Sequence, residues 1–333
     1  MKRVKVFLAV ILAMSILLMT ACTTTAYDTD ADPSVPSTDP RSSAKDERVT
    51  IGFCMNAMDE FQSEMVAIFR DICERRGIDI IVTNADAKPD KQLADLDSLL
   101  VQNPDVIYIV PADPAAMAPG FQAAIDAGIP TLTGVQAEEY ANLTFTLALD
   151  QYVVGLMVNE WLVGYMAENP SLELQAGYIW GALGWAVLND RYQGFVDGLL
   201  NVYPDRINVL AEQTANWSST ESMALVEDWL QAFPQMNAII SQSDEMSIGA
   251  INALKSANVD FSKFYIVSFD GSPNAQTHIR EGTLHSTVFY AKKAIGEVIV
   301  DYALRIAAGE NLRGQSFDVT RLACFVMTKD NID

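Results

Sequence analysis

The sequence predicts an α/β protein with two lobes, each built on a doubly wound parallel sheet. Short apolar runs rich in β-branched residues alternate with amphipathic helices, which is the pattern of buried parallel strands and their crossover helices. The loops between these elements are short, as expected for a sheet covered on both faces. The chain has 333 residues, half of them hydrophobic, and this is enough for two domains of ordinary size.

The first round of alternation ends at the polar stretch 136–142. Its first helix, 59–76, shows the pattern clearly, because apolar side chains recur every three or four residues and Gly77 ends the helix. We expect strands at 49–55, 78–83, 106–110 and 128–132, and helices at 59–76, 91–101 and through Met117 and Phe121.

The second round repeats the pattern and runs nearly to the end of the chain. We expect an extended segment at 143–149, strands at 176–180, 207–211, 238–241, 264–269 and 286–290, helices at 152–166, 190–200, 220–233, 245–257 and 291–308, and a short helix ending at Gly282. The tail 317–327 is again predicted to be β-like. The chain therefore contains two α/β lobes in sequence.

Asp270 is the first candidate binding residue. It follows the apolar run 265–269, so it stands at the carboxyl end of a predicted strand, where open α/β sheets bind their ligands. The alternative is an ordinary Asp-Gly turn in which Asp270 bonds to its own backbone. The following strand, 286–290, leads into the long helix 291–308 and could leave the lobe.

The charge balance argues against nucleic acid as a partner. The formal net charge is −21, and it becomes −24 if the leader is removed, because Lys2, Arg3 and Lys5 are the only charged residues before Cys22. Such a chain repels phosphate backbones.

The first residues have the form of a secretory signal. A basic start precedes the apolar run 6–19, which is too short for a comfortable membrane span. The run ends in Leu17-Leu-Met-Thr-Ala-Cys22, which resembles a bacterial lipobox apart from Met19, so we expect a signal peptide at 1–21 and a lipidated Cys22. The alternative is a plain cleaved signal. The segment 22–47 is rich in Thr, Ser, Asp and Pro and reads as a flexible tether.

The remaining cysteines and histidines do not suggest a metal site or an enzyme. Cys54, Cys73 and Cys324 have no close spacing, so buried thiols are expected and no metal. Two histidines, no GxSxG elbow and no phosphate-cradling loop leave no candidate catalytic residue, and no cofactor is expected. The segment 181–184 faintly suggests a nucleotide loop, but a strand-to-helix turn explains it.

Several motifs occur in a characteristic order along the chain. They are Pro111-Ala-Asp113, Gly128-Ile-Pro130, Arg191-Tyr-Gln-Gly-Phe195, Gln242-Ser-Asp-Glu-Met-Ser-Ile-Gly-Ala250 and Val267-Ser-Phe-Asp-Gly271. Together they resemble the sugar-binding family of bacterial ABC-transporter substrate-binding proteins, the ribose and galactose/glucose type. The resemblance covers nearly all of the chain from about Val49 onward.

This resemblance implies two lobes joined by three hinge crossings, near 148–150, 290–291 and 318–320, with the ligand held between the lobes. It assigns 48–149 plus 291–318 to an N-terminal lobe and 150–290 plus 319–333 to a C-terminal lobe. The helix 291–308 should therefore return to the first lobe.

The resemblance also implies a set of pocket residues. Phe61 and Trp217 match the aromatic rings that sandwich the apolar faces of a sugar. Asp59 and Arg191 match polar pocket positions, and the rigid fork of arginine suits adjacent hydroxyls. Asp270 matches a carboxylate that accepts hydrogen bonds from sugar hydroxyls.

Several positions depart from the family pattern and make the expected pocket less polar. Val135, Ser243 and Tyr290 replace Asp, Asn or Gln, and Trp185 and Val187 replace polar residues of the galactose type. Trp185 lies in a predicted loop, so it is a further candidate for ligand contact. A buried polar group without a partner costs about 1–3 kcal/mol, so we expect a less hydroxylated or substituted sugar, or a small cyclic polyol.

The expected function is capture of such a ligand by lobe closure and delivery to an ABC permease, by a monomer attached to the membrane through its lipid alone. One alternative is a receptor that presents a sugar or autoinducer-type signal to a membrane kinase, and another is a nucleoside- or polyol-binding relative. A repressor of the same lobe architecture would need a helix-turn-helix before the first strand, where this chain has its leader and tether.

Overall fold

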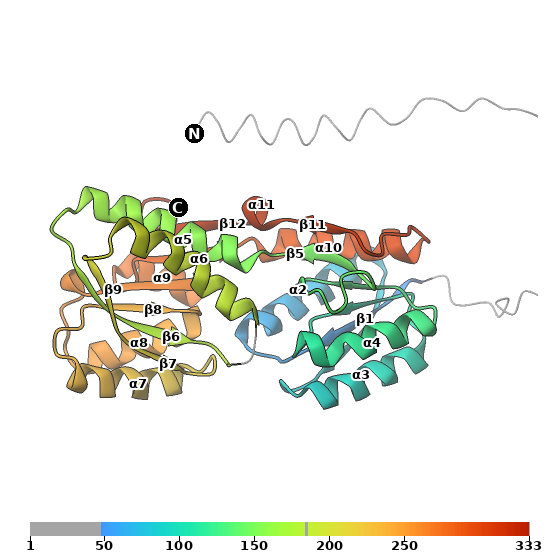
Figure 1. Cartoon of the computed structure of the whole chain (residues 1–333). Helices are drawn as coiled ribbons and strands as arrows, with labels where there is room; N and C mark the ends of the chain where they lie inside the picture. The colour runs from blue at the N-terminus through green and yellow to red at the C-terminus, as the bar shows by residue number, and fades with distance from the viewer. Residues whose placement is uncertain (1–47, 184–185, 333) are drawn as a thin grey trace, which may run out of the picture. The chain divides into compact units, whose positions relative to one another are not determined.

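Two six-stranded sheets carry the fold in the computed structural model, which describes residues 48–183 and 186–332 (Figure 1). Each sheet lies between helices, so the predicted α/β class with two doubly wound sheets is confirmed. Cys22, Trp185 and the predicted signal peptide and tether lie outside the described residues.

The first sheet has the strand order β11-β5-β4-β3-β1-β2, and all its neighbouring strands are parallel. Its strands are β1 (Thr50–Met55), β2 (Asp79–Asn84), β3 (Val106–Ile109), β4 (Thr131–Thr133), β5 (Phe145–Ala148) and β11 (Ser316–Asp318). Its helices are α2 (Glu60–Arg76), α3 (Pro89–Gln102), α4 (Pro114–Asp126) and α10 (Lys292–Ala307). Alternate strand residues face opposite layers: Phe53 and Tyr108 pack toward α2 and α10, whereas Ile107 and Ile109 pack toward α3 and α4.

The second sheet has the order β12-β10-β9-β8-β6-β7, in which the pair β10 and β12 is antiparallel and the other pairs are parallel. Its strands are β6 (Leu174–Trp180), β7 (Ile207–Thr214), β8 (Ala238–Ser241), β9 (Tyr265–Asp270), β10 (Ser286–Tyr290) and β12 (Cys324–Thr328). Its helices are α5 (Gln151–Glu168) and α6 (Ala186–Val202) on one face and α7 (Ser219–Ala232), α8 (Asp244–Ser256) and α9 (Pro273–Glu281) on the other.

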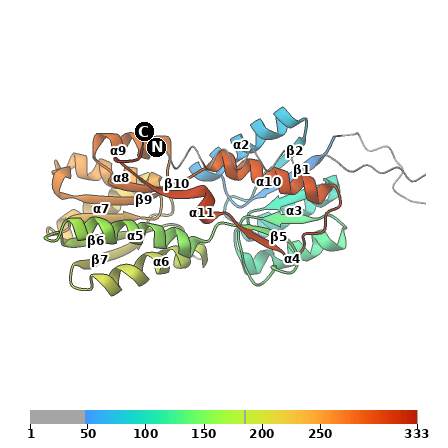
Figure 2. The same ribbon diagram turned by 90° about the horizontal axis from the view of Figure 1, so that it is seen from above.

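Three connections join the two sheets. The chain passes from β5 to α5, returns from β10 to α10, and passes again from β11 through the short helix α11 (Thr320–Ala323) to β12. Helix α10 lies beside α2 in both ribbon views (Figures 1 and 2). Ion pairs from Arg75 and Arg76 to Glu297 fix this contact, and Gly296 leaves room for the side chain of Ile68.

The tail was predicted to be β-like, and β11 and β12 occupy its two ends, but the prediction missed the short helix between them. Helix α11 interrupts it, because the Asp318 carboxylate accepts hydrogen bonds from both the backbone N–H and the hydroxyl of Thr320 and so turns the chain. The Thr320 hydroxyl in turn accepts from the backbone N–H of Asp150, at 2.7 Å. The first and third connections are therefore tied to each other.

Side-chain caps begin most of the helices that follow strands. Asp59, Asp150, Ser243 and Ser272 each accept a hydrogen bond from a backbone N–H in the first turn of α2, α5, α8 and α9. These caps fix the helix N-termini at the carboxyl ends of the strands, where their free N–H groups gather.

The predicted buried thiols are confirmed. Cys54, Cys73 and Cys324 are free and buried, and burial raises the pKa of Cys54 and Cys73 to about 11 and that of Cys324 to about 12. Thiols with such pKa values carry almost no thiolate at neutral pH and are poor nucleophiles.

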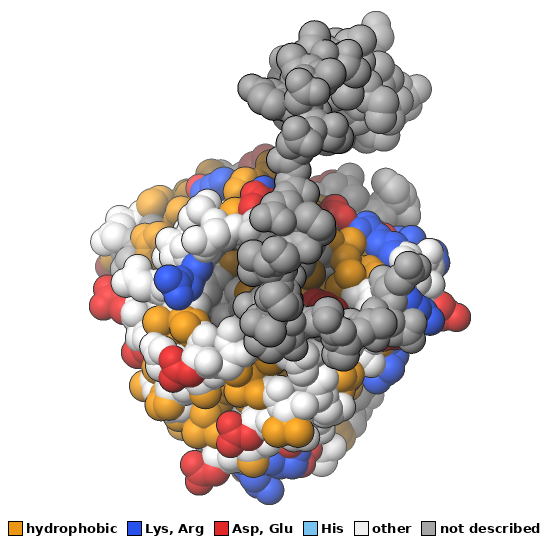
Figure 3. Space-filling model, turned by 90° about the vertical axis from the view of Figure 1, so that its right-hand side faces the viewer, with side chains coloured by type: hydrophobic (Ala, Val, Ile, Leu, Met, Phe, Trp, Pro, Cys, Tyr) orange, Lys and Arg blue, Asp and Glu red, His pale blue; other side chains and the backbone are white. Residues whose placement is uncertain are grey.

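The surface of the described residues is mixed in character. On the part of the face in Figure 3 that the grey atoms leave visible, acidic, basic and hydrophobic side chains are interspersed. Within residues 48–183 and 186–332, each helix is too short or too polar to span a lipid bilayer.

Candidate functional site

A cavity of about 460 Å³ lies where the carboxyl ends of strands from both sheets meet. The first sheet contributes the segments after β1, β3, β4 and β5, and the second contributes those after β7, β8, β9 and β10, together with α6. This is the edge at which open α/β sheets bind ligands. Side chains from both sheets thus face a single space.

Eight of the predicted site residues line this cavity. They are Asp59, Phe61, Val135, Arg191, Trp217, Ser243, Asp270 and Tyr290. The ninth, Trp185, lies outside the described residues, and nothing is described of the Val187 side chain. The contact of these eight residues with a ligand stays a prediction.

Two aromatic rings of the site, Phe61 and Trp217, pack closely against neighbouring residues. The ring of Phe61 meets that of Tyr290 edge to face, with centroids 5.5 Å apart, and the Lys292 ammonium lies 4.7 Å from the Phe61 centroid. Trp217 lies against Gly181 so closely that a Cβ built on Gly181 would be 2.2 Å from the indole ring. Gly181 is thus required for close approach of the ring, and the suggestion of a nucleotide loop at 181–184 is unnecessary.

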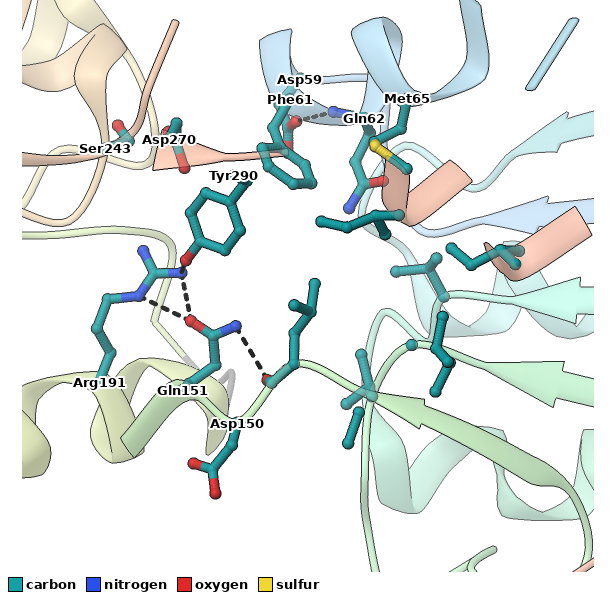
Figure 4. A pocket seen from close by; sticks show the side chains of 18 of the residues that line it. Asp59, Phe61, Gln62, Met65, Asp150, Gln151, Arg191, Ser243, Asp270 and Tyr290 are labelled. Atoms are coloured by element: carbon teal, nitrogen blue, oxygen red, sulfur yellow. Dashed lines mark hydrogen bonds between the residues drawn. The ribbon is translucent and has the colours of Figure 1, made fainter. Parts of the chain in front are cut away.

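Arg191 forms the centre of the polar wall. Its buried guanidinium donates from Nε and Nη2 to Gln151 Oε1, at 3.0 and 2.6 Å, and from Nη1 to the Gln242 carbonyl at 2.6 Å. A longer bond, 3.4 Å, runs from Nη2 to the Tyr290 hydroxyl (Figure 4). The guanidinium also lies over the ring of Phe269. All these acceptors are neutral, so one of the five N–H groups and the positive charge remain available to a ligand oxygen.

Asp270 has a backbone conformation that is rare for a residue with a side chain. Its φ is +115°, and the next residue, Gly271, also has a positive φ of 66°. Such strain, of order 1–3 kcal/mol, persists where the surrounding structure imposes it and is frequent at binding sites. The half-buried carboxylate faces the cavity and is not the ordinary Asp-Gly turn considered from the sequence.

Asp244 is a buried carboxylate next to Asp270, and its backbone N–H donates to the Asp270 carboxylate at 3.4 Å. It is fully buried, and its carboxylate accepts from the hydroxyls of Ser268 and Thr287, at 2.6 and 2.7 Å, and from the Ser272 backbone N–H at 2.6 Å. Burial raises the pKa of Asp244 to about 6. Burial and the charge of Asp244 raise the pKa of Asp270 well above its ordinary value. These two carboxyl groups therefore bind protons at a higher pH than free carboxyl groups do.

Two glutamates meet at the cavity from different lobes. Glu60 is the first residue of α2, and Glu245 is the second residue of α8. Partial burial beside the cavity, followed by the negative charges of Glu245 and Asp244, raises the pKa of Glu60 even though much of its side chain is exposed. The two carboxylates repel each other when both are ionised.

The other wall of the cavity is apolar and comes from the first sheet and its helices. Its side chains are Met65, Phe69, Tyr108, Val110, Leu147, Ile295 and Ile299. Figure 4 shows Met65 across the cavity from Arg191 and Gln151. The site is thus divided into a polar half and an apolar half.

Sequence reasoning missed Gln151, Gln242 and Asp244. Each is adjacent to a residue that it did identify, either Asp150 at the first crossing or Ser243 after a strand. The position of a polar residue immediately after a predicted strand was the available signal. Among the residues that the structure describes, no three His, Cys, Asp or Glu side chains are grouped to hold a metal ion.

Two α/β lobes that line one cavity with aromatic rings, a buried arginine and carboxylates define a two-lobed solute-binding protein. The family model of the periplasmic binding protein domain matches residues 51–311. The chain therefore belongs to the periplasmic binding protein family, whose members act outside the cytoplasm.

Individual relatives agree with this assignment. The ribose import binding protein of Bacillus subtilis is 25% identical over 307 residues, which cover 92% of this chain and 94% of that protein. A putative rhizopine-binding protein of Rhizobium meliloti is 30% identical over 239 residues, covering 70% of this chain and 76% of the relative.

Solved structures show the same fold. An ABC-transporter solute-binding protein of Bacillus halodurans with bound myo-inositol matches with a TM-score of 0.75 and 23% identity, over 87% of this chain and 98% of that one. A Mycobacterium smegmatis protein in complex with β-D-fucofuranose matches with a TM-score of 0.77 and 20% identity, over 85% and 92% of the two chains.

Proposed function

We propose that this protein is the extracytoplasmic solute-binding component of an ABC importer and that it captures a sugar or sugar-like molecule in the cavity between its lobes. The observation that carries the proposal is the joining of Arg191, Asp270, Phe61 and Trp217, contributed by both lobes, around one cavity. Family membership and the sugar- and cyclitol-binding relatives support it.

Each group has a distinct role in this proposal. The free N–H of Arg191 donates to a ligand oxygen, and the Asp270 carboxylate accepts from ligand hydroxyls. Phe61 and Trp217 cover the apolar C–H faces of the ring. Val135, Ser243, Tyr290 and Asp59 complete the contact surface, and Trp185 is a further contact. None of these groups is proposed to perform chemistry on the ligand.

Lobe closure couples binding to transport. A ligand that touches both lobes binds the closed arrangement better than the open one and shifts the population toward it. The crossings near 148–150, 290–291 and 318–320 serve as the hinge, with lobes of 48–149 plus 291–318 and 150–290 plus 319–333. A permease reads the closed form.

Attachment to the membrane follows from the leader. Cleavage after Ala21 and lipidation of Cys22 would leave the monomeric domain on a tether of residues 22–47, anchored by its lipid alone. Radiolabelled palmitate incorporated into the wild-type chain, and lost in Cys22→Ala, is the expected result.

The binding proposal is tested by titrating the leaderless Cys22→Ser chain with pentoses, hexoses, deoxy-sugars, inositols and nucleosides while its tryptophan fluorescence is recorded. A saturable change that is lost in Trp217→Ala is the expected result. Small-angle scattering should show compaction with the bound ligand. A fully silent panel, or binding without compaction, would contradict the proposal.

A further inference from the structure

One side of the cavity is lined by apolar side chains of the first lobe. We call it the apolar chamber and define it by Met65, Phe69, Val110, Leu147, Ile295 and Ile299, with Tyr108 among them. These side chains belong to α2, α10, the end of β3 and β5, and each is at least nine-tenths buried from solvent. The chamber is therefore the part of the binding cavity that borders the core of the first lobe.

Tyr108 places one polar atom in this chamber. The side chain is 6% exposed, and its ring packs against Phe53 and Phe69. Its hydroxyl makes no hydrogen bond to any residue that the structure describes, and burial raises the pKa of the hydroxyl, which stays protonated. A buried hydroxyl is normally paired, so this donor is available to a group that enters the chamber.

Gly134 leaves room for the Tyr108 hydroxyl because it has no side chain. A Cβ built on Gly134 would lie 2.6 Å from the Tyr108 oxygen, and Gly134 itself lines the cavity. Any side chain at this position would therefore displace the hydroxyl. The neighbouring Val135 is a further apolar residue of the cavity lining.

These observations separate two kinds of ligand. The hydroxyls of an unsubstituted sugar have partners at Arg191 and Asp270, but in the chamber they would meet six apolar side chains and lose their water. An apolar group would be stabilised there by burial. A cavity of about 460 Å³ is within the range that holds ligands larger than a single sugar ring.

We infer that the ligand is a sugar or cyclitol with an apolar substituent, that this substituent occupies the apolar chamber, and that the Tyr108 hydroxyl donates to an oxygen on it. This inference rests on the proposed function and specifies its substrate class. The polar ring lies at Arg191 and Asp270, and the substituent points toward α2 and α10. The chamber then selects for substituted compounds over the free sugars.

The test is calorimetric titration of the leaderless Cys22→Ser chain with matched probe series. D-Ribose, D-galactose and myo-inositol are each compared with their methyl, propyl and pentyl glycosides or ethers. Affinity for at least one series should rise about fourfold for each buried methylene until the chamber is full.

Variants of the chamber wall make the assignment specific. Val110→Phe, which fills the chamber, should abolish the gain from the alkyl groups, and Ile299→Ala, which enlarges it, should move the optimum to a longer chain. Tyr108→Phe should weaken probes with an ether oxygen in the substituent by up to about tenfold relative to all-carbon substituents. Ile251→Val, in the core of the second lobe on α8, is the matched control and should keep the full gain.

The outcomes separate this inference from the function on which it rests. Binding of the free sugars with equal or weaker binding of every alkylated partner would refute the chamber while leaving the proposed function standing. Failure of all free and alkylated probes to bind would refute both. A gain that persists in Val110→Phe would place the substituent elsewhere and also overturn the inference.

Discussion

Replacement of Gly181 by alanine gives a sharp test of the site geometry. The Cβ of alanine would lie 2.2 Å from two atoms of the Trp217 ring, closer than carbon atoms approach. The backbone itself accepts alanine, since Gly181 does not have a positive φ. The indole must therefore move, and overpacking of this kind costs about 1–3 kcal/mol of unfolding free energy.

The measurement is urea denaturation of four chains, namely wild type, Gly181→Ala, Trp217→Ala and the double variant. If the indole is the obstacle, Gly181→Ala costs about 1–3 kcal/mol in the wild-type background and less than about 0.5 kcal/mol once the ring is gone. Ligand affinity should fall in Gly181→Ala, because the displaced ring no longer lines the cavity as it does now.

Gly164 provides the matched control for this substitution. It lies within α5, and a Cβ built there meets no other atom within 4 Å. Gly164→Ala should therefore stabilise the protein by about 0.5–1 kcal/mol through helix propensity. An equal cost of Gly181→Ala with and without Trp217 would refute the assignment of the ring to this position.

Three further predictions concern the charged groups of the cavity. Because the pKa of Glu60 is raised, the stability linked to its protonation is present at acid pH and is lost as the pH rises through the raised pKa. Glu60→Gln should therefore raise the melting temperature at pH 7.5 and not at pH 4. The increase should be small because the Glu60 side chain is solvent-exposed. Asp244 contributes stability that is full below about pH 3.8 and lost by about pH 6, and Asp244→Asn should flatten this dependence in urea titrations. The same variant should lower stability by about 1–3 kcal/mol at acid pH, where Asp244 is protonated and carries no ionisation cost, since the Ser272 N–H loses its acceptor. Arg191→Met should abolish ligand binding in calorimetry and lower the unfolding free energy by about 1–3 kcal/mol, because the buried Gln242 carbonyl loses its donor; unchanged affinity would exclude Arg191 from the site.

The fold class could be predicted because its signal is local and repeated. Alternation of short apolar runs and amphipathic helices predicted the strands 238–241 and 286–290 with the bounds of β8 and β10, and it placed the other strands before the tail within a few residues. The short helix in the tail was not predicted, because the turn at Asp318 depends on a hydrogen bond from the Thr320 N–H to the Asp318 carboxylate. The neighbouring residues have a β-like pattern. The periodicity of the sequence alone does not predict such a hydrogen bond.

The site was predictable where a residue stood directly after a strand or matched a family motif. Eight predicted residues line the cavity, but the apolar chamber was not foreseen. Phe69, Leu147 and Ile299 have the periodicity of ordinary core positions, and periodicity cannot distinguish a wall that faces packed atoms from one that faces a cavity. Asp244 was missed because an acidic residue at a helix N-terminus usually faces solvent, whereas here three hydrogen bonds hold it inside.

The three connections between the sheets affect how the protein folds during synthesis and export. Strand β11 pairs with β5, and the Thr320 hydroxyl bonds to Asp150 across 170 positions of sequence. The first sheet therefore lacks an edge strand, and α2 lacks its neighbour α10, until residues 292–318 have been made. A ribosome-bound or half-exported chain must carry these apolar faces uncovered, and its closing contacts are of long range and slow to form. Neither sheet can therefore be complete before residues 316–328 have been made.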